Sequence, residues 1–566
     1  MSVTDWCVLL ITLLSIVVYG VWKSRGTKNI EGYLLADRQL PWYQVGLSVM
    51  ATQASAITFL SAPGQAYGDG MRFVQFYFGL PLAMIVICIA FIPVFSRMNV
   101  YTAYEYLEQR FDNKTRSLTA FLFLLQRGLS TGITIYAPAI ILSTILGVGI
   151  TYTTLLMGGL VILYTVYGGT KAVSYTQMFQ MAVIFSGLFF AGYMVVHLLP
   201  EEVGFTDALH IAGKMGKMNA LDTTFDWNNR YNIWSGLIGG LFLQLSYFGT
   251  DQSQVGRYLT GKSVAESRIG LIMNGLLKIP MQFLILLIGI LVFAFYQFHT
   301  PPVYFNKVEV ASIQNSTYRN EYNALQEQYD VLQQGKRKQV DAYIAALHQQ
   351  DKAQQQWLGV QLKQADAQSE AIRTSAAELI KKNTANKDAN DRDYVFLSFV
   401  MDHLPVGLVG LLIAIIFLAA MGSTASGLNS LASTTIVDFY KRFHKKLENE
   451  AHYLSASRWA TILWGLFCVV VAFFASRVGN LIEAVNILGS LFYGTILGIF
   501  LVAFWMKKVK GTAVFYAALL TEVIVIVISL QEHPIAFLWL NVIGCLLLML
   551  LAACFQFCFV RSAKKP

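Results

Sequence analysis

The sequence carries little charge for its length. Only 13% of its 566 residues are Asp, Glu, Lys or Arg, whereas 55% are hydrophobic and the mean hydropathy is +0.51. A soluble chain usually carries about 25% charged residues. Apolar runs of roughly 18 or more residues, long enough to cross a bilayer, recur along almost the whole chain. We therefore expect an all-α, multi-pass protein of the cell membrane, with the lipid bilayer as its surroundings and no nucleic-acid partner.

Motifs of several enzyme and redox classes are also missing. The eight histidines lie at the ends of apolar runs or in loops, and there is no HExxH motif, which argues against haem, zinc and di-iron chemistry. No P-loop is present, so ATP does not drive the protein directly. The six cysteines lie in apolar runs without a CxxC pair, so we expect neither a disulfide framework nor a metal site built on thiolates. The sequence thus predicts a protein that is not an enzyme.

The apolar runs predict about 13 membrane-spanning helices. Lys and Arg concentrate in alternate loops, for example at Arg38, Lys171 and Lys508, and are sparse in the loops between them. The positive-inside rule then places the N-terminus outside and the C-terminus inside. The expected spans have the approximate limits 4–22, 41–66, 73–97, 117–146, 149–167, 173–199, 231–250, 268–297, 405–436, 454–476, 480–506, 512–530 and 535–559.

One long hydrophilic segment, residues 306–395, interrupts this pattern on the predicted outer side. It contains two groups of apolar residues at helical spacing, and Gly335 falls between the groups. The spacing predicts an exposed helical hairpin or a short coiled coil. A solvated insertion without a transport role and a docking surface for a protein partner both remain open. The two groups are Tyr322, Leu325, Tyr329 and Leu332, and Val340, Tyr343, Ile344 and Leu347.

Two of the predicted spans contain polar stretches. Span 41–66 includes "GLSVMATQASAITFLSAPGQ", and span 405–436 includes "FLAAMGSTASGLNSLASTT". A single small residue there is best explained by close helix packing, but this density of Ser, Thr and Gly predicts interrupted helices that line a cavity or bind an ion. Ala420, Ser423 and Thr424 share one helix face. Two hydroxyls together with freed carbonyls would make a neutral oxygen site suited to a hard cation.

These stretches resemble motifs of the sodium:solute symporter family, which includes sodium/glucose, proline, sialic acid, iodide and monocarboxylate symporters. The resemblance covers nearly the whole chain apart from the insertion. "ITIYAPAIIL" is most similar to the iodide and monocarboxylate branch, whereas "ATQASAITF" also resembles the sialic acid branch. The four long motifs, in order, are "GYLLADRQLPWYQVGLSVMATQASAITFLSAPGQAYGDG", "YTVYGGTKAVSYTQMFQ", "GTDQSQVGRYLTGKS" and "AAMGSTASGLNSLASTTIVDFYKRF".

The resemblance implies a LeuT-type fold of two inverted five-helix repeats that works by alternating access around a mid-membrane site. It divides the chain into an extra span and cytoplasmic loop (1–40), a first repeat (41–199), an external loop (200–230), a second repeat (231–506) interrupted by the external hairpin at 306–395, and two C-terminal spans (507–566).

The resemblance also implies two sets of binding residues. The sodium site common in the family falls on the carbonyls of Ala51, Ala54 and Ala420 and the hydroxyls of Ser423 and Thr424, which agrees with the site proposed from residue types. The second set would bind the substrate, and its aromatic members are also compatible with plain core packing. The substrate positions would be Gln53, Ser55, Thr58, Phe73, Tyr77, Tyr136, Gln244 and Asn486.

Gln177 is a departure from the family, which often has Asp at this position. In members that bind a second sodium, that Asp and nearby hydroxyls supply the ligands, but here the hydroxyl positions hold Ser426 and Gly427. An amide offers a hard cation far less attraction than a carboxylate. We therefore predict one sodium ion per cycle, with Gln177 forming hydrogen bonds behind the ion site. Plain hydrogen bonding between helices, worth about 1 kcal/mol, is the alternative.

Arg127 is the second unusual residue, because it lies about ten residues into its span. The acidic residues considered as its partners are Glu483, Glu522, Glu105 and Asp438. An arginine inside the membrane is a functional candidate, which makes an anionic substrate attractive. Extension of the side chain to the inner surface, or binding to carbonyls at a helix end, is the alternative.

We thus predict sodium-coupled symport of a small organic solute or anion, with sodium as the bound ion and a monocarboxylate, sugar or sugar acid as the substrate. The alternative function is a membrane sensor or scaffold that keeps the transporter fold and acts with a partner through the hairpin. A passive channel is disfavoured by the well-formed cation site.

Overall fold

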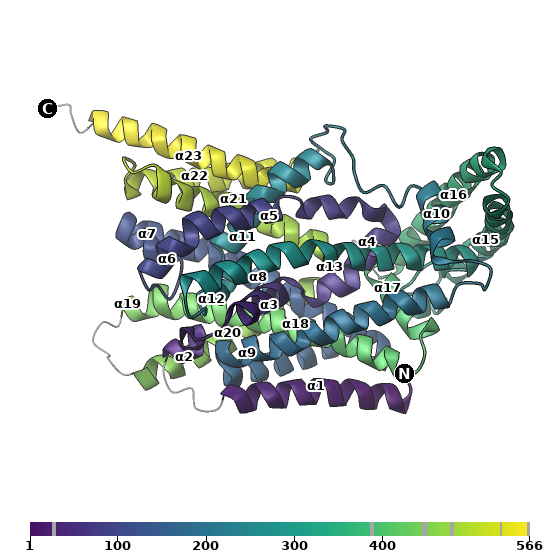
Figure 1. The fold of residues 1–566 in the computed structure, drawn as a ribbon, viewed down its shortest axis with the longest axis horizontal. Coiled ribbons are helices and arrows are strands. Elements are labelled where there is room, and N and C mark those ends of the chain that lie inside the picture. Colours follow the sequence, from purple (N-terminus) through teal and green to yellow (C-terminus); the bar gives the residue numbers. More distant parts are fainter. Residues whose placement is uncertain (25–29, 385–389, 444–449, 476–479, 532–534, 563–566) are drawn as a thin grey trace.

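The computed structural model describes residues 1–24, 30–384, 390–443, 450–475, 480–531 and 535–562, and every regular element within these ranges is a helix. Part of the predicted loop within 1–40, residues 25–29, lies outside them. The long helices run roughly along one axis, with the N-terminus and the insertion at one end and the C-terminus at the other (Figure 1). The predicted orientation also places the N-terminus and the insertion on one side; it stays a prediction.

The first half of the chain alternates long helices with short ones. Its elements are α1 (Val3–Ser24), α2 (Ile30–Leu35), η1 (Ala36–Arg38), α3 (Trp42–Gln53), α4 (Ala56–Asp69), η2 (Gly70–Tyr77), α5 (Leu80–Val86), η3 (Ile87–Phe91), α6 (Ile92–Arg97), α7 (Tyr104–Arg110), α8 (Asn113–Leu146), α9 (Ile150–His197), α10 (Phe205–Lys214), η4 (Ser235–Gly239), α11 (Gly240–Gly249), α12 (Gln252–Tyr258) and α13 (Val264–Phe298).

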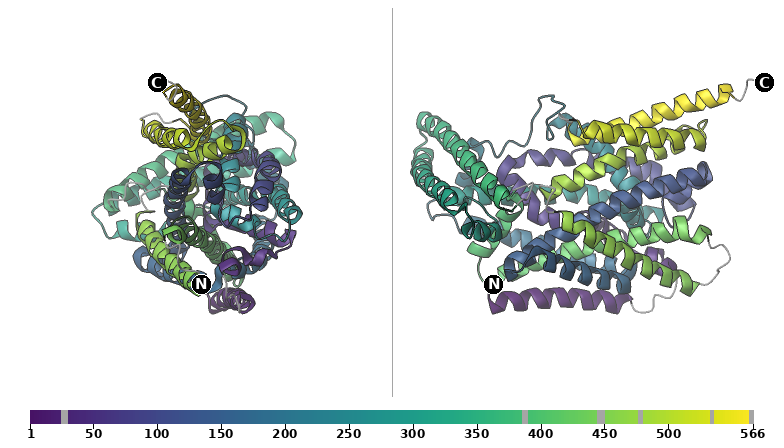
Figure 2. Two further views of the ribbon diagram at one scale, coloured as in Figure 1. Left: turned by 90° about the vertical axis from the view of Figure 1, so that its left-hand side faces the viewer. Right: turned by 180° about the vertical axis from the view of Figure 1, so that it is seen from behind.

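The second half begins with the insertion and ends with two helices at the edge of the bundle (Figure 2). Its elements are α14 (Lys307–Gln314), α15 (Arg319–His348), α16 (Lys352–Thr384), α17 (Arg392–His403), α18 (Leu408–Thr434), η5 (Thr435–Tyr440), α19 (Lys441–Phe443), α20 (Glu450–Phe474), α21 (Leu481–Trp505), α22 (Gly511–Ser529) and α23 (Phe537–Ser562).

Ten helical stretches of the described residues are long and apolar enough to cross a membrane. Three further predicted spans coincide with shorter pieces: 41–66 with the separate helices α3 and α4, 149–167 with the first part of α9, and 231–250 with η4 and α11. A broken span gives helices below the length that a bilayer crossing needs, because each piece covers only part of about 30 Å. The count of about 13 spans therefore stays a prediction.

Two spans are interrupted at positions that matter for the site. Between α3 and α4 the chain leaves helical geometry at Ala54 (φ −81°, ψ 76°) and Ser55 (φ −81°, ψ 173°). Between α11 and α12 it does so at Thr250 and Asp251, and the Asp251 side chain accepts a hydrogen bond from the Ser253 backbone N–H. Each break frees main-chain groups inside the bundle, which is tolerated where they face protein or a cavity.

The expected interruption of span 405–436 is wrong, because α18 is continuous from Leu408 to Thr434. Its hydroxyls bond to carbonyls of the preceding turn, as the Ser423 Oγ does to Ala419 at 2.9 Å and the Ser426 Oγ does to Gly422 at 2.9 Å. Such bonds satisfy Ser and Thr within a regular helix. A polar stretch in an apolar span thus does not by itself show where the backbone breaks.

Within the insertion, α15 and α16 form a helical hairpin, but its turn is not at Gly335. That glycine lies inside α15, where a Cβ atom would meet nothing, and both apolar groups belong to this one helix. The chain reverses between α15 and α16, at a turn that includes Gln350 (φ 57°). Arg337 donates to the carbonyl of Phe298 at the end of α13, so the hairpin is bonded to the main helical bundle.

Gly169 divides α9 at the glycine pair of the motif "YTVYGGTKAV". Its backbone (φ 56°, ψ −173°) falls in a region that only glycine adopts readily, and a Cβ atom would lie 2.7 Å from the Tyr33 ring. The two parts of α9 can therefore meet at this angle only with glycine there.

We expect Gly169→Ala to lower the free energy of unfolding by about 1–3 kcal/mol, because it combines backbone strain with this clash. Gly159→Ala is the matched control in the same helix, where a Cβ atom meets nothing within 4 Å. The control should be neutral or slightly stabilising. Thermal unfolding of both variants in detergent measures the difference, and equal stability would contradict the strain argument.

Candidate functional site

The break between α3 and α4 leaves main-chain oxygens free inside the bundle. The carbonyls of Met50 and Gln53 accept hydrogen bonds from the N–H groups of Ala54 and Ser55, at 2.8 Å and 3.0 Å. The carbonyls of Ala51 and Ala54, both predicted cation ligands, accept no backbone N–H from the described residues. Both residues are buried. Unpaired buried carbonyls are costly, so their oxygens are suited to an ion or another donor.

The facing helix α18 packs against both α3 and α4 and supplies the other predicted ligands. The Thr424 side chain is 1% exposed, and its Oγ1 has no hydrogen-bond partner among the described residues. The Ser423 Oγ donates to the carbonyls of Ala419 and Ala420, which leaves its lone pairs free to accept or to bind a cation. These residues therefore fit a neutral oxygen site for sodium; their role as ligands stays a prediction.

Gln177 occupies the centre of a buried oxygen cluster one turn from this site. Its Oε1 accepts a hydrogen bond from the Ser48 Oγ at 2.6 Å. Its Nε2 donates to the Thr52 Oγ1 at 3.2 Å, the Ser426 Oγ at 3.0 Å and the Gly422 carbonyl at 3.2 Å. The amide nitrogen therefore lies where these three oxygens converge, the position that a small cation would otherwise need.

Gly427, the one of the two expected hydroxyl positions that has no hydroxyl, lies against a neighbouring helix. A Cβ atom on Gly427 would lie 2.5 Å from the Thr131 Oγ1 of α8. A contact this short requires the Thr131 side chain or the backbone to shift. The close approach of α8 and α18 therefore disfavours a longer side chain at this position.

A cavity of about 100 Å³ lies beside the break. It collects six of the eight predicted substrate residues and also Arg127. The Oε1 atom of Gln53 and both amide atoms of Gln244 are buried without a partner among the described residues, so they are available to a solute. The six are Gln53, Ser55, Thr58, Tyr77, Gln244 and Asn486.

Phe73 and Tyr136 do not line this cavity. Phe73 is fully buried, stacks on Phe76 with ring centroids 5.5 Å apart, and meets Tyr77 edge to face. It supports two residues of the cavity wall from behind. Tyr136, which is 9% exposed, lies on α8 away from the lining. The resemblance to the family did not distinguish aromatic residues that line the cavity from those that lie behind its wall or away from it.

Arg127 is neutralised by Asp251, which the sequence interpretation did not include among its partners. The Arg127 Nη2 donates to the Asp251 Oδ2, and the Tyr493 hydroxyl donates to the same carboxylate at 2.9 Å. The guanidinium also lies 5.4 Å from the ring centroid of Tyr247. The Asp251 side chain is fully buried, and its other oxygen accepts from Ser253. Asp251 lies in the second helix break, which the motif had suggested only as a helix exit.

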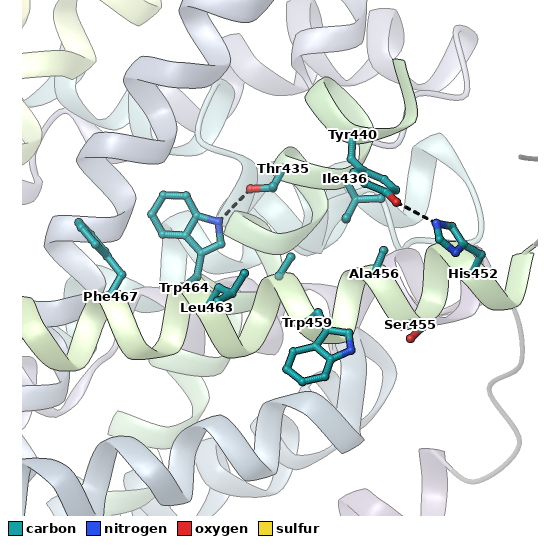
Figure 3. A pocket seen from close by; sticks show the side chains of 11 residues that line it. Thr435, Ile436, Tyr440, His452, Ser455, Ala456, Trp459, Leu463, Trp464 and Phe467 are labelled. Atoms are coloured by element: carbon teal, nitrogen blue, oxygen red, sulfur yellow. Dashed lines mark hydrogen bonds between the residues drawn. The ribbon is translucent and has the colours of Figure 1, made fainter. Parts of the chain in front are cut away.

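A separate groove lies between η5 and α20 (Figure 3). Two hydrogen bonds line it, from Trp464 Nε1 to Thr435 Oγ1 and between Tyr440 and His452, each 2.9 Å long. Trp459, Leu463 and Phe467 of α20 are exposed there, as expected on a helix that faces lipid. None of the predicted site residues lies in it.

Comparison with known proteins assigns the family. A family model described as "Sodium:solute symporter family" matches residues 33–318 and 371–521. The chain belongs to the sodium:solute symporter family. The match omits residues 319–370, which include α15 and most of α16, so this part of the insertion is an addition to the pattern that the family shares.

Among curated relatives, the sodium/iodide cotransporter of Homo sapiens is 33% identical over 275 residues, which cover 48% of this chain and 42% of that protein. The sodium-dependent multivitamin transporter of Oryctolagus cuniculus is 26% identical over 509 residues, covering 88% and 66%. In both, the match spans less than two thirds of the relative. The sodium/glucose cotransporter of Vibrio parahaemolyticus is 26% identical over 530 residues, covering 91% and 83%.

A solved structure of a Na⁺-coupled sialic acid symporter in a substrate-bound outward-open state is similar in fold. Its TM-score is 0.74 over 98% of both chains, at 21% sequence identity. At this identity the likeness speaks for the fold alone.

Proposed function

We propose that this chain is a sodium-coupled symporter for a small organic solute and that it moves one sodium ion per cycle. The observation that carries the proposal is that one break, between α3 and α4, borders both the candidate ion site and the central cavity. Ala51 and Ala54 offer free carbonyls on one side of the break, and Gln53 and Ser55 line the polar cavity on the other. Family membership supports the same activity.

This arrangement gives a physical basis for coupling. An ion held by the Ala54 carbonyl would order the peptide that presents Ser55 to the solute. Because binding energies are linked reciprocally, a solute that favours the same backbone geometry raises the affinity for sodium. The cavity is smaller than the roughly 300 Å³ of typical small-molecule pockets, so solute entry requires it to widen. Alternating access, with sodium favouring the outward-open state, supplies that opening.

The proposed stoichiometry depends on Gln177. A second sodium among Thr52, Ser426 and Gly422 would have to displace the Gln177 amide nitrogen, which already donates to all three oxygens. It would find no carboxylate there to offset its lost hydration. Gln177 thus acts as a fixed neutral substitute for an ion.

The cavity suits a solute with hydroxyl groups. Among the described residues, its free polar atoms are amide atoms of Gln53 and Gln244 and the Arg127 Nε donor, and the charge of Arg127 is already paired with Asp251. A small anion would gain little from a guanidinium that is neutralised in this way. Hydroxyls can both donate to and accept from the amides of Gln53 and Gln244. We therefore favour a sugar or sugar acid over a simple monocarboxylate.

Uptake into proteoliposomes tests the transport proposal. We expect at least one labelled sugar, sugar acid or monocarboxylate to accumulate when sodium is high outside, and uptake to fall to background when choline replaces sodium. Uptake should saturate with solute concentration. Equal uptake in choline would contradict sodium coupling, and uptake that does not saturate would indicate a channel.

Gln177→Glu tests the one-ion proposal, because it keeps the length of the side chain and replaces the N–H donors with a carboxylate. We expect equilibrium binding of ²²Na to rise from one to two ions per chain. Gln177→Met, which removes the amide without adding charge, should leave one. Two ions bound by the unmodified protein would refute the proposal, as would a single ion bound by Gln177→Glu.

A further inference from the structure

A second and larger cavity, of about 740 Å³, lies between the insertion and the body of the protein. Helices α15 and α16 form one wall, and the ends of α4, α13 and α17 form the other. These elements lie together at the end of the molecule that carries the N-terminus (Figure 1). We call this cavity the outer chamber, defined by Tyr67, Lys217, Gln297, Lys336, Arg373 and Arg392.

Charged side chains of both signs line the outer chamber, and every carboxylate among them faces a cation. Glu370 lies 3.8 Å from Arg373. The other three acids form close pairs, each with a basic residue of the insertion. These pairs are Lys336 with Asp366, Arg373 with Asp391, and Arg392 with Asp69, each at 2.9 Å.

Two chamber cations remain without an acidic partner among the described residues, Lys217 and Lys363. The Lys217 ammonium donates to the carbonyl of Gly68 and lies 4.8 Å from the Phe293 ring centroid. Burial lowers the pKa of Lys217, although the more distant carboxylates of Asp366 and Asp69 act in the opposite direction. A half-buried ammonium with only a carbonyl and a ring beside it is a favourable partner for an anion.

Polar atoms without partners in the chamber wall indicate which other groups a bound ligand would carry. Within the described residues, the Arg373 Nη1 donor and the Gln297 Oε1 acceptor are buried without hydrogen bonds. Tyr67, Tyr296 and Tyr329 add aromatic walls. Lys217 and Arg373 can donate to a carboxylate, Gln297 can accept from a hydroxyl, and aromatic faces can cover a carbon skeleton.

We propose that the outer chamber is a binding site for a small organic anion that carries a carboxylate and hydroxyl groups, with Lys217 as its principal charged contact. The site is separate from the central cavity and needs no sodium. Its far wall comes largely from residues 319–370, which the family model does not match, so it is a feature that this chain adds to the family fold.

The floor of the outer chamber connects to the central cavity by hydrogen bonds. Asp69, which pairs with Arg392, also accepts from the Gln65 Nε2 at 2.6 Å. The same amide lies 3.3 Å from the Glu483 Oε1, in the first turn of α21. Asn486, less than one turn further, lines the central cavity. Two hydrogen bonds and less than one helical turn therefore separate Asp69 of the chamber from a residue that lines the central cavity.

Calorimetric titration of gluconate into the full-length protein in nanodiscs, with choline in place of sodium, tests this proposal. We expect one saturable site and no heat with glucose, which lacks the carboxylate. Lys217→Gln should weaken binding at least about ten-fold, whereas Lys217→Arg should retain it. Lys381→Gln, an exposed lysine of α16 outside the chamber, is the matched control and should bind as the unmodified protein does.

Asn486→Ala separates the chamber from the central cavity and should bind gluconate normally. Absence of gluconate binding, equal binding by Lys217→Gln, or loss of binding in Asn486→Ala would each overturn the proposal. Thermal unfolding of Lys217→Gln close to that of Lys217→Arg shows that a loss of binding is not a loss of fold. Because no sodium is present, failure of sodium-driven uptake would leave this result unaffected.

Discussion

Thr424→Val should remove about half or more of the stabilisation that sodium gives to this protein while making the sodium-free protein more stable. The Thr424 Oγ1 is buried without a partner in the described part of the chain, so replacing it with a methyl group of the same shape removes an unsatisfied polar atom, worth about 1–3 kcal/mol. The same change removes a ligand from the proposed ion site. Saturating sodium, at about 100 times Kd, stabilises a protein by about 2.7 kcal/mol. We expect sodium affinity to fall at least about ten-fold.

Thr434→Val is the control, because Thr434, on the same helix, is also buried and its hydroxyl has no partner among the described residues. It lies ten residues away, about 15 Å along the helix. This variant should gain stability with and without sodium and keep the full response to sodium. Thermal unfolding across a sodium titration measures both variants. An unchanged sodium response in Thr424→Val would remove Thr424 from the ion site.

Asp251→Asn should cost about 3–5 kcal/mol of folding stability, because it leaves the Arg127 guanidinium charged and without its partner inside the protein. We expect a sharp fall in unfolding temperature and in the yield of folded protein. The double variant Arg127→Gln/Asp251→Asn should recover part of the loss, since it removes both charges. Thermal unfolding of the single and double variants measures the coupling.

The exposed pair of Arg337 and Asp341 offers a control on the surface, where ion pairs contribute about 0–1 kcal/mol. Asp341→Asn should unfold close to the unmodified protein. If Asp251→Asn were equally mild, the buried pair would not be a structural requirement. If the double variant were both stable and fully active in uptake, Arg127 would have no part in binding the solute.

The location of the candidate site could be predicted because polar residues in an apolar span have few structural explanations. "ATQASA" had to belong either to packing or to a break, and the structure breaks there, at Ala54 and Ser55. The same reasoning was wrong for residues 405–436, since hydroxyls that bond to their own helix leave α18 continuous. The composition of a segment shows that it is polar. Whether its hydroxyls bond to their own helix or the backbone breaks depends on hydrogen bonds that composition does not show.

Pairs of residues that are far apart in the chain could not be predicted from the sequence. Arg127 and Asp251 are 124 residues apart, and the two helices meet only in the folded bundle. The sequence offered one usable signal, since Asp251 follows an apolar run and begins a new helix as its cap. Likewise, Gly335 indicated a turn that the structure places near Gln350, because an exposed glycine is tolerated within a long helix.

The one-ion stoichiometry that we propose from the hydrogen bonds of Gln177 would limit how far a solute can be concentrated. A tenfold sodium gradient is worth about 1.4 kcal/mol and a potential of 100 mV about 2.3 kcal/mol per charge. One sodium moved with a neutral sugar could therefore sustain a gradient of about 500-fold, and a second ion would square that value. A carboxylate-bearing solute would cancel the charge of the single ion. Its accumulation would then follow the sodium gradient alone, about tenfold, and would not respond to membrane voltage.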